Sequence, residues 1–164
     1  IQHIGVGGEE FDDRKFEAAF SSLEELNLFA RQRGVEVLLE NIPNKLSSAE
    51  RLNYFLGITH LDNGYCFDTG HAHIHTGVEH EFNLMKERIR STHIHDNDGE
   101  HDVHLFPFLA SGGTIDWKRT MTLLRSRRGQ YPMMLELREA EGMDPLLEKA
   151  AEVRERLADL GHPE

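Results

Sequence analysis

The sequence has very little cysteine: Cys66 is the single thiol among its 164 residues. One cysteine cannot form a disulfide within the chain, so a scaffold stabilised by intrachain disulfides is excluded. Structural zinc sites that are built from several thiolates are excluded as well. A chain without disulfides fits a reducing compartment, and we expect the protein to be cytoplasmic.

Long apolar runs and basic residues are also scarce. No run is long enough to span a bilayer, and the first residues lack the pattern of a secretory signal. Lys and Arg number 18 against 29 Asp and Glu, which gives a formal net charge of -11. Affinity for nucleic acid depends on cationic side chains that neutralise phosphates, so we expect neither a membrane nor a nucleic acid as partner. The excess of carboxylates favours a bound divalent cation and a small-molecule substrate.

Several familiar motifs are absent or incomplete. The sequence has no Walker glycine loop, no nucleophile elbow and no Cys-x-x-Cys pair. His93 and His95, followed by Glu100, imitate a cupin metal motif, but cupins are all-β proteins. Residues 96–99, DNDG, imitate a calcium loop, but the glycine comes too early in it. These patterns are therefore set aside.

The densest group of reactive side chains lies in residues 91–117, STHIHDNDGEHDVHLFPFLASGGTIDW. Histidines and acidic residues alternate there over a short stretch of backbone. Imidazoles and carboxylates that crowd together repel or lose solvation unless they bind a cation. A divalent metal is the simplest species that would hold them together, and the rest of the chain would supply further ligands.

Short apolar strands alternate with amphipathic helices along the chain. Such strands, each followed by a helix, indicate a parallel sheet covered by helices, which is an α/β fold. About five βα units are present, whereas a closed (β/α)₈ TIM barrel takes roughly 250 residues. We therefore predict a single partial barrel domain over residues 1–164, with N-terminal strands missing because the chain is a piece of a longer protein. An open sheet leaves two strand edges, so a homo-oligomer is an alternative. The predicted strands are 1–7, 35–40, 65–68, 91–95 and 133–137, and the predicted helices are 12–33, 47–56 with Ser47 as its cap, 82–90, a helix to 128 capped by Thr114 or Asp116, and 143–160.

Every predicted strand ends on a residue type that binds metals. These residues are His3, Glu40, Asp68, His95 and Glu136. In parallel α/β folds the active site lies at the carboxyl ends of the strands. Five such residues at one end of a sheet favour a common site for a divalent metal, with Mn²⁺, Mg²⁺, Co²⁺, Zn²⁺ and Fe²⁺ as candidates.

Glu40 and Glu136 each end an apolar strand, where an unpaired carboxylate would be costly. Two carboxylates that face each other across a metal suit the removal and return of a proton on opposite faces of a substrate carbon. We therefore predict that both glutamates bind the metal and act as the acid and base. The alternative is a salt bridge from each glutamate to a basic residue inside the barrel.

The histidines and the loop carboxylate offer further ligands. We take His93 and His95 to point to opposite sides of their strand, so that only one faces the site. His95 is the predicted ligand, and His93 is predicted to pack or to support a ligand. Asp102 and His104 are predicted to bind an additional metal, with a solvated acidic loop as the alternative. His71 in the motif DTGH can face the site, or it can bond the backbone at the start of a helix.

Seven short segments match a known family, in the order that the family has them. They are HIG at His3, LLEN at Glu40, FDTGH at 67–71, HIHDND at 93–98, DVH at 102–104, GGTIDW at 112–117 and LEL at Glu136. With them the chain resembles the xylose-isomerase-like TIM-barrel superfamily. That superfamily includes sugar-phosphate isomerases and epimerases and the endonuclease IV type of AP endonuclease, AP endonuclease family 2.

This resemblance implies roles for the strand-end residues. It implies one metal with four ligands, Glu40, Asp68, His95 and Glu136. In epimerase-like members the two glutamates also move the proton, and His71 contacts the substrate. In endonuclease-like members a separate metal is bound by His71, Asp102 and His104, and His3 belongs to another.

We therefore expect a metal-dependent isomerase or epimerase that acts on a sugar or sugar phosphate through an enediolate. One alternative is a metal-dependent phosphodiesterase of the AP-endonuclease type, because several metals together stabilise the attacking and leaving oxygens of phosphoryl chemistry. The other alternative is a truncated barrel without catalytic activity.

Overall fold

The computed structural model describes residues 13–127, 129, 131–139 and 144–160. His3 and the strand predicted over 1–7 lie outside these residues. Helices and strands alternate along the described chain. Their order is α1 (Asp13–Arg31), β1 (Leu38–Glu40), α2 (Ala49–Ile58), β2 (Gly64–Asp68), α3 (Thr69–Ile74), α4 (Val78–Met85), β3 (Ile89–Ile94), α5 (Trp117–Arg125), β4 (Met133–Leu135) and α6 (Leu146–Asp159).

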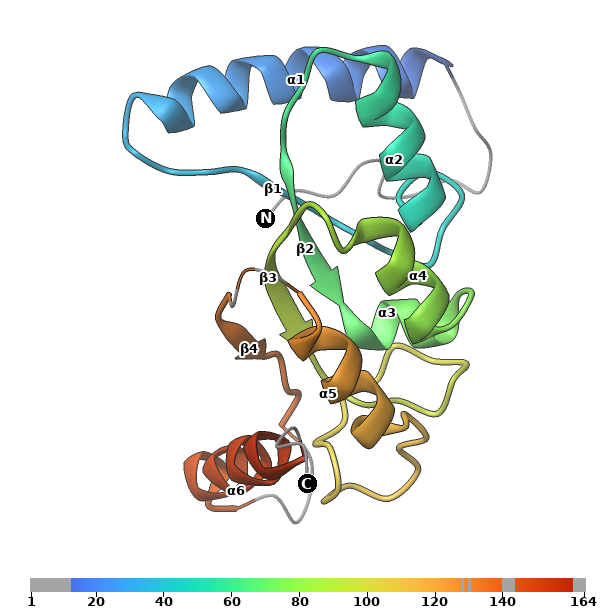
Figure 1. Ribbon diagram of the computed structural model, residues 1–164, viewed down its shortest axis with the longest axis vertical. Coiled ribbons are helices and arrows are strands. Elements are labelled where there is room, and N and C mark those ends of the chain that lie inside the picture. The colour runs from blue at the N-terminus through green and yellow to red at the C-terminus, as the bar shows by residue number, and fades with distance from the viewer. Residues whose placement is uncertain (1–12, 128, 130, 140–143, 161–164) are drawn as a thin grey trace.

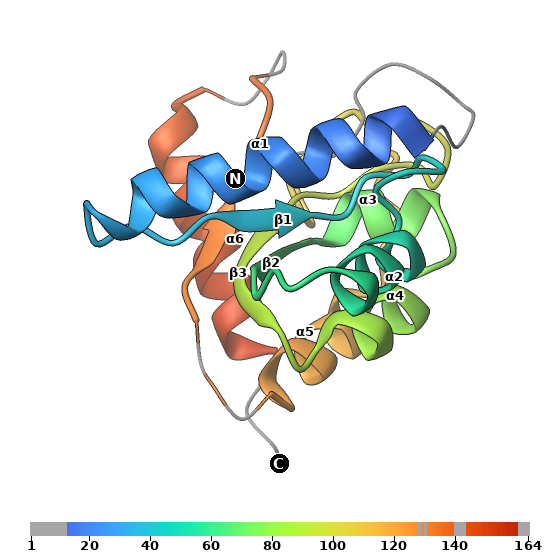
Figure 2. The same ribbon diagram turned by 90° about the horizontal axis from the view of Figure 1, so that it is seen from above.

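The described strands form one parallel sheet in the order β1-β2-β3-β4, so neighbours in sequence are neighbours in space. A connection between parallel strands has to cross back over the sheet, and helices make these crossings. Helices α2, α4 and α5 pack in a row along one side of the sheet (Figure 1). Helix α1 lies beside β1 in both views (Figure 2). The α/β fold predicted from the alternation is therefore confirmed.

The apolar core lies between the sheet and this row of helices. Phe67 in β2 packs edge-on against Phe82 in α4, with ring centroids 5.8 Å apart. Tyr65 is fully buried, and its hydroxyl donates a hydrogen bond to Oδ1 of Asn53 in α2 at 2.8 Å. Close packing of large rings fixes the helices against the strands. Polar residues are then left to gather at the carboxyl ends of the strands.

A buried carboxylate joins α2 to α4. Glu81 is 1% exposed, and its Oε2 accepts a hydrogen bond from the backbone amide of Ala49, the first residue of α2. Its Oε1 accepts from the hydroxyl of Thr76 at 2.6 Å and from Nδ1 of His75 at 2.9 Å. These bonds satisfy a charge that burial would otherwise make costly, and they fix the start of α2 against the neighbouring helix.

Helix α1 is the longest described helix and confirms the helix predicted over 12–33 within one or two residues. Leu23 and Ala30 on its inner face are buried, whereas Glu24, Glu25 and Arg31 are exposed. Across the described ranges, no helix is both long enough and apolar enough to cross a membrane.

Several element boundaries differ from the prediction; for example, the strand predicted over 35–40 begins at Leu38, and the strand predicted over 133–137 ends at Leu135. Ser48, and not Ser47, caps α2, because its side chain accepts a hydrogen bond from the backbone amide of Arg51. The helix predicted over 82–90 is α4, which begins at Val78 directly after Gly77; Gly77 has a φ of 99°, which a glycine adopts readily. The last residues of the predicted range instead open β3.

One short helix was not predicted. Asp68 ends β2 and at the same time caps α3, since its Oδ1 accepts a hydrogen bond from the backbone amide of His71 at 2.7 Å. Asp116 caps α5 in the same way through the amide of Arg119, which agrees with one of the two predicted caps.

Candidate metal centre

The register of the parallel sheet brings polar side chains together at one edge. Glu40 at the end of β1 is aligned with Cys66 in β2, and Asp68 at the end of β2 is aligned with His93 in β3. Glu136 follows β4, where its backbone amide donates a hydrogen bond to a carbonyl of β3. Because the strands all run the same way, these residues gather where active sites of parallel α/β folds lie.

Four of these side chains form what we call the strand-end group: Glu40, Asp68, His93 and Glu136, whose nearest ligand atoms lie within 4.8 Å of one another. His93 Nδ1 is at the centre, 2.8 Å from Glu40 Oε1, 2.7 Å from Glu136 Oε2 and 3.8 Å from Asp68 Oδ2. The two glutamates come from the two outermost strands of the described sheet. The sheet must therefore curve strongly, as in a barrel, to bring both to one nitrogen.

The expectation that His93 and His95 point to opposite sides is wrong. Side chains alternate along a strand, so residues two positions apart project from the same face. Both imidazoles accordingly reach Asp68: His93 faces Oδ2, and His95 Nε2 lies 3.1 Å from Oδ1. His93, and not the predicted His95, lies beside the two glutamates.

Negative charge surrounds His93. Burial disfavours the imidazolium, but hydrogen bonds with Cys66 and Glu40 outweigh this and raise the pKa of His93 to about 11. A place that stabilises one positive charge so strongly also attracts a divalent metal, which would displace the imidazole proton on binding.

Two buried carboxylate oxygens of the strand-end group have no hydrogen-bond partner among the described residues, Asp68 Oδ2 and Glu136 Oε2. Glu136 Oε2 approaches His93 Nδ1 but lies outside hydrogen-bond geometry. A buried carboxylate oxygen without a donor is costly unless a cation satisfies it. Three carboxylates and one imidazole make a mixed oxygen and nitrogen donor set that suits Mn²⁺, Mg²⁺, Co²⁺ or Zn²⁺. The residues present therefore fit a divalent metal.

A second set of side chains, which we call the loop group, lies beside the first: His71, His95, Asp102 and His104, with ligand atoms within 4.8 Å of one another. Asp102 Oδ2 is 3.2 Å from His71 Nε2, and Asp102 Oδ1 is 3.2 Å from His104 Nε2. The rings of His95 and His104 stack, with centroids 3.9 Å apart and an angle of 8° between them. One carboxylate thus faces three imidazoles, which is a second arrangement that suits a metal.

Charge pairing holds His71 and Asp102 together. The hydrogen bond from His71 lowers the pKa of Asp102 to about 2. Burial disfavours the protonated ring of His71, but the hydrogen bond to Asp102 and the charge of Asp68 outweigh it and raise the pKa of His71 to about 9. The other nitrogen of this ring, Nδ1, lies 2.8 Å from the backbone carbonyl of Asn41. His71 is thereby fixed between the two groups, with Nε2 directed at the loop.

Asp96 anchors the long loop that carries Asp102 and His104. Its buried carboxylate accepts four hydrogen bonds, from the backbone amides of Asn97, Thr114 and Ile115 and from the indole of Trp117. His104 Nδ1 also donates to the carbonyl of Glu136 at 3.0 Å. The loop predicted over 96–113 is therefore held at both ends, and Asp102, although exposed, contacts His71.

Two supporting residues were not singled out from the sequence. Asn41 exchanges two hydrogen bonds with the backbone of Asp68, at 3.0 and 2.8 Å, and so fixes the end of β2. Gly70 lies directly beneath His95, because a Cβ there would be 2.0 Å from Cε1 of the ring. Asn41 follows the predicted ligand Glu40 in the motif LLEN, and Gly70 precedes His71 in the motif DTGH. This adjacency is the feature of the sequence that could have identified them as supporting residues.

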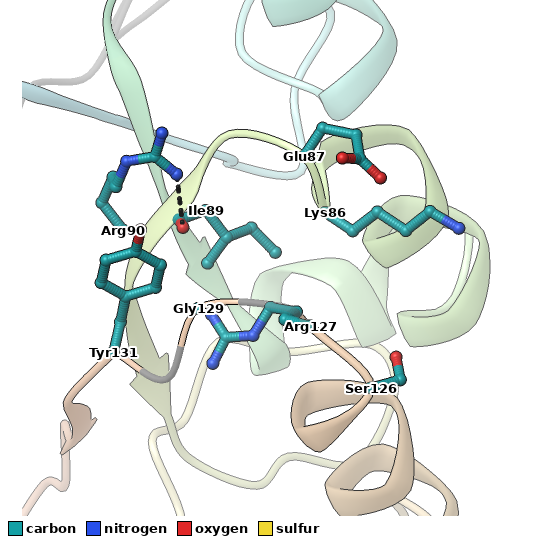
Figure 3. Close-up of a pocket in the computed structure, with 8 residues that line it drawn as sticks. All are labelled: Lys86, Glu87, Ile89, Arg90, Ser126, Arg127, Gly129 and Tyr131. Carbon is teal, nitrogen blue, oxygen red and sulfur yellow. Dashed lines mark hydrogen bonds between the residues drawn. The ribbon is translucent and has the colours of Figure 1, made fainter.

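A separate cavity of about 450 Å³ lies at the opposite end of β3 (Figure 3). It is lined by Ile89 and Arg90, the first residues of the strand, and by Arg127 and Tyr131. Both guanidinium groups lie over the Tyr131 ring, at 5.3 and 5.9 Å from its centroid. No member of the strand-end or loop group lines this cavity, which lies at the end of β3 opposite to the one where active sites of parallel α/β folds lie.

Two uncharacterised proteins are similar to this chain in sequence. The chain is 27% identical over 147 residues to the uncharacterised protein y4fM of Sinorhizobium fredii, covering 83% of this chain and 46% of that protein. It is 30% identical over 111 residues to the uncharacterised protein MJ1614 of Methanocaldococcus jannaschii, covering 64% of this chain and 42% of that protein. The chain therefore spans about half the length of these relatives.

Solved structures resemble the whole described fold. The crystal structure of a D-tagatose 3-epimerase-like protein matches with a TM-score of 0.73 and 23% identity, covering 97% of this chain and 60% of that one. A Thermus thermophilus protein, from a structure soaked with zinc chloride, matches with a TM-score of 0.64 and 26% identity, covering 98% of this chain and 61% of that one. The family model described as xylose isomerase-like TIM barrel matches residues 1–160, so the chain belongs to that family and its sheet is part of a TIM barrel, as predicted.

Proposed function

We propose that this chain carries the metal site of an isomerase or epimerase that acts on a sugar or sugar-like small molecule. The observation that carries the proposal is the meeting of Glu40 and Glu136 at His93 Nδ1, at 2.8 and 2.7 Å. The convergence of two carboxylates from opposite edges of the described sheet supports a pair that acts on two sides of one substrate. Similarity to an epimerase-like structure supports the same class of reaction.

In this mechanism the glutamates transfer the proton. One carboxylate removes the proton on the carbon next to a carbonyl, and the other returns a proton to the opposite face or to the neighbouring carbon of the enediolate. Glu40 is buried, whereas the side chain of Glu136 is 43% exposed, so substrate would enter from the side of Glu136. A divalent metal held by the strand-end group would polarise the carbonyl and hydroxyl oxygens of the substrate.

The neighbouring side chains orient this pair. His95 donates to Oδ1 of Asp68 and leaves Oδ2 directed at the strand-end group. His71 lies between the two groups, 3.7 Å from Glu40 Oε1, where it can contact a substrate hydroxyl. Hydrogen bonds from such supporting residues fix the orientation of metal ligands.

The test is the exchange of solvent protons into a ketose substrate in the presence of Mn²⁺ or Co²⁺. Glu136→Gln keeps the size of the side chain but cannot accept a proton, so exchange should fall by at least about 100-fold. Glu139→Gln is the matched control, because Glu139 is exposed and follows the same strand end. Exchange in Glu136→Gln at the rate of the control would refute the role assigned to Glu136.

The loop group favours a second candidate, a phosphodiesterase of the AP-endonuclease type. A second metal at His71, His95, Asp102 and His104 would suit the stabilisation of two oxygens on phosphorus. The net charge of -11 opposes a nucleic-acid substrate. Metal stoichiometry separates the candidates: one ion per chain favours the isomerase, whereas two or three with zinc, together with nicking of abasic duplex DNA, favour the phosphodiesterase.

A further inference from the structure

Cys66 lies in β2 next to the strand-end group. It precedes Asp68 by two positions in β2, so the two side chains project from the same face of the strand. In the sheet it is the direct neighbour of Glu40. The residue is fully buried, and its Sγ lies within 4.8 Å of the nearest ligand atoms of Glu40 and His93.

Two overlapping ligand sets therefore share Glu40 and His93. One set is completed by Asp68 and Glu136, which supply only oxygen, and the other is completed by the sulfur of Cys66. Asp68 is 0% exposed, and its Oδ2, which has no hydrogen-bond partner in the described residues, faces His93 at 3.8 Å. That buried oxygen points independently to a cation beside His93, the residue that both ligand sets share with Glu40.

Sulfur changes which metal such a site prefers. Oxygen donors suit Mg²⁺ and Mn²⁺, whereas a thiolate favours Zn²⁺ and other thiophilic ions. We propose that Cys66 is a metal-selecting ligand, whose sulfur binds a zinc or cobalt ion held by Glu40 and His93 and so favours these ions over manganese and magnesium. The proton of the thiol leaves to solvent as the metal–sulfur bond forms. This inference rests on the proposed metal site.

The position of the thiol is consistent with this role. A coordinated thiol is deprotonated by its metal, and Glu40 and His93 would hold that ion beside the sulfur. The thiol is unavailable to other reactions because it is 0% exposed.

Cobalt titration of the purified 164-residue chain tests the proposal directly. A sulfur ligand gives Co²⁺ a charge-transfer band in the near ultraviolet, and Cys66 is the single cysteine, so the band can arise from no other residue. We expect the band to saturate at one ion per chain. In Cys66→Ser the band should vanish, Zn²⁺ affinity should fall about 10- to 100-fold, and Mn²⁺ affinity should change less than about 3-fold.

The outcomes separate this inference from the proposed function. Cobalt that binds with visible d–d bands but without the sulfur band overturns the role of Cys66 and leaves the metal site standing. Absence of cobalt, zinc and manganese binding in the wild-type chain overturns both. The wild-type spectrum decides the question even if Cys66→Ser fails to fold, and an unchanged ratio of zinc to manganese affinity in a folded Cys66→Ser or Cys66→Ala also overturns the inference.

Discussion

Gly70→Ala is a sharp test of how the two groups are assembled. Gly70 is the second residue of α3, and the ring of His95 lies directly over its Cα. A Cβ at this position would be 2.0 Å from Cε1 and 2.5 Å from both ring nitrogens of His95. His95 itself is 0% exposed and stacks on His104, so a movement of its ring would disturb its neighbours.

The sign of the effect follows from two opposing contributions. Ordinary carbon contacts lie at about 3.5 Å, so the ring would have to shift by about 1.5 Å. Overpacking of this kind costs about 1–3 kcal/mol. Replacing glycine by alanine within a helix favours folding by about 0.5–1 kcal/mol. The clash is the larger contribution, so we expect Gly70→Ala to lower the free energy of unfolding by about 1–2 kcal/mol.

The shift should also change metal binding. The hydrogen bond between His95 Nε2 and Asp68 Oδ1, 3.1 Å long, cannot survive a displacement of this size. The loop group loses its geometry directly, and Asp68 loses the donor that orients it. We therefore expect metal affinity to fall about 10- to 100-fold, measured by isothermal titration with Zn²⁺ and Mn²⁺ beside urea unfolding of each variant.

Gly57→Ala is the matched control. Gly57 also lies in a helix, α2, and a Cβ there would meet nothing within 4 Å. That variant should be as stable as wild type or more stable by about 0.5–1 kcal/mol, with unchanged metal affinity. The reasoning is refuted if Gly70→Ala behaves like Gly57→Ala in both measurements. In the double variant Gly70→Ala with His95→Ala, removal of the ring should recover part of the lost stability.

Three further predictions concern buried polar residues. Burial raises the pKa of Tyr65 to about 12 from 10.0, so the stability that its neutral hydroxyl contributes is complete below pH 10 and is lost as pH rises towards 12. Over this range the free energy of unfolding should fall by up to about 2 kcal/mol more in wild type than in Tyr65→Phe. Parallel curves of unfolding free energy against pH for the two proteins would contradict this. Glu81→Ala removes three hydrogen bonds inside the protein and should lower the free energy of unfolding in urea by about 2–4 kcal/mol. The control Glu87→Ala changes an exposed residue and should lower it by less than about 0.5 kcal/mol. Equal losses in the two variants would show that the hydrogen bonds of Glu81 do not stabilise the fold. In Asp96→Asn the amide has one oxygen, which cannot accept hydrogen bonds from both the loop amides and the indole of Trp117. The fluorescence of this single tryptophan should therefore shift to the red, and the free energy of unfolding should fall by about 1–3 kcal/mol. An unchanged emission spectrum would argue against the role of Asp96 in holding the loop.

Sequence patterns predicted the sheet because its signals are local. Apolar runs that end on Glu40, Asp68 and Glu136 mark strands and strand ends, and parallel register then brings these ends to one edge. The short helix α3 was missed because six residues are too few to show a helical period. It depends on Asp68 as both strand end and cap.

The distribution of histidines between the two groups was not predictable in the same way. His93 and His95 share a face of β3, and their different partners follow from the register with β2, which contains an irregularity between Tyr65 and Cys66. Asp102 reaches the site because Asp96 binds amides almost twenty residues further along the chain. Such contacts between distant residues leave no periodic signal in the sequence.

Asp68 divides its two oxygens between the neighbouring groups. Oδ1 contacts His95 and the amide of His71, and Oδ2 faces His93. A ligand that moves the carboxylate at one group therefore changes the position of the oxygen that Asp68 offers to the other. Thermodynamic reciprocity then requires that each site change the affinity of the other by the same factor. Ligand binding at the two groups would then be coupled through one shared carboxylate.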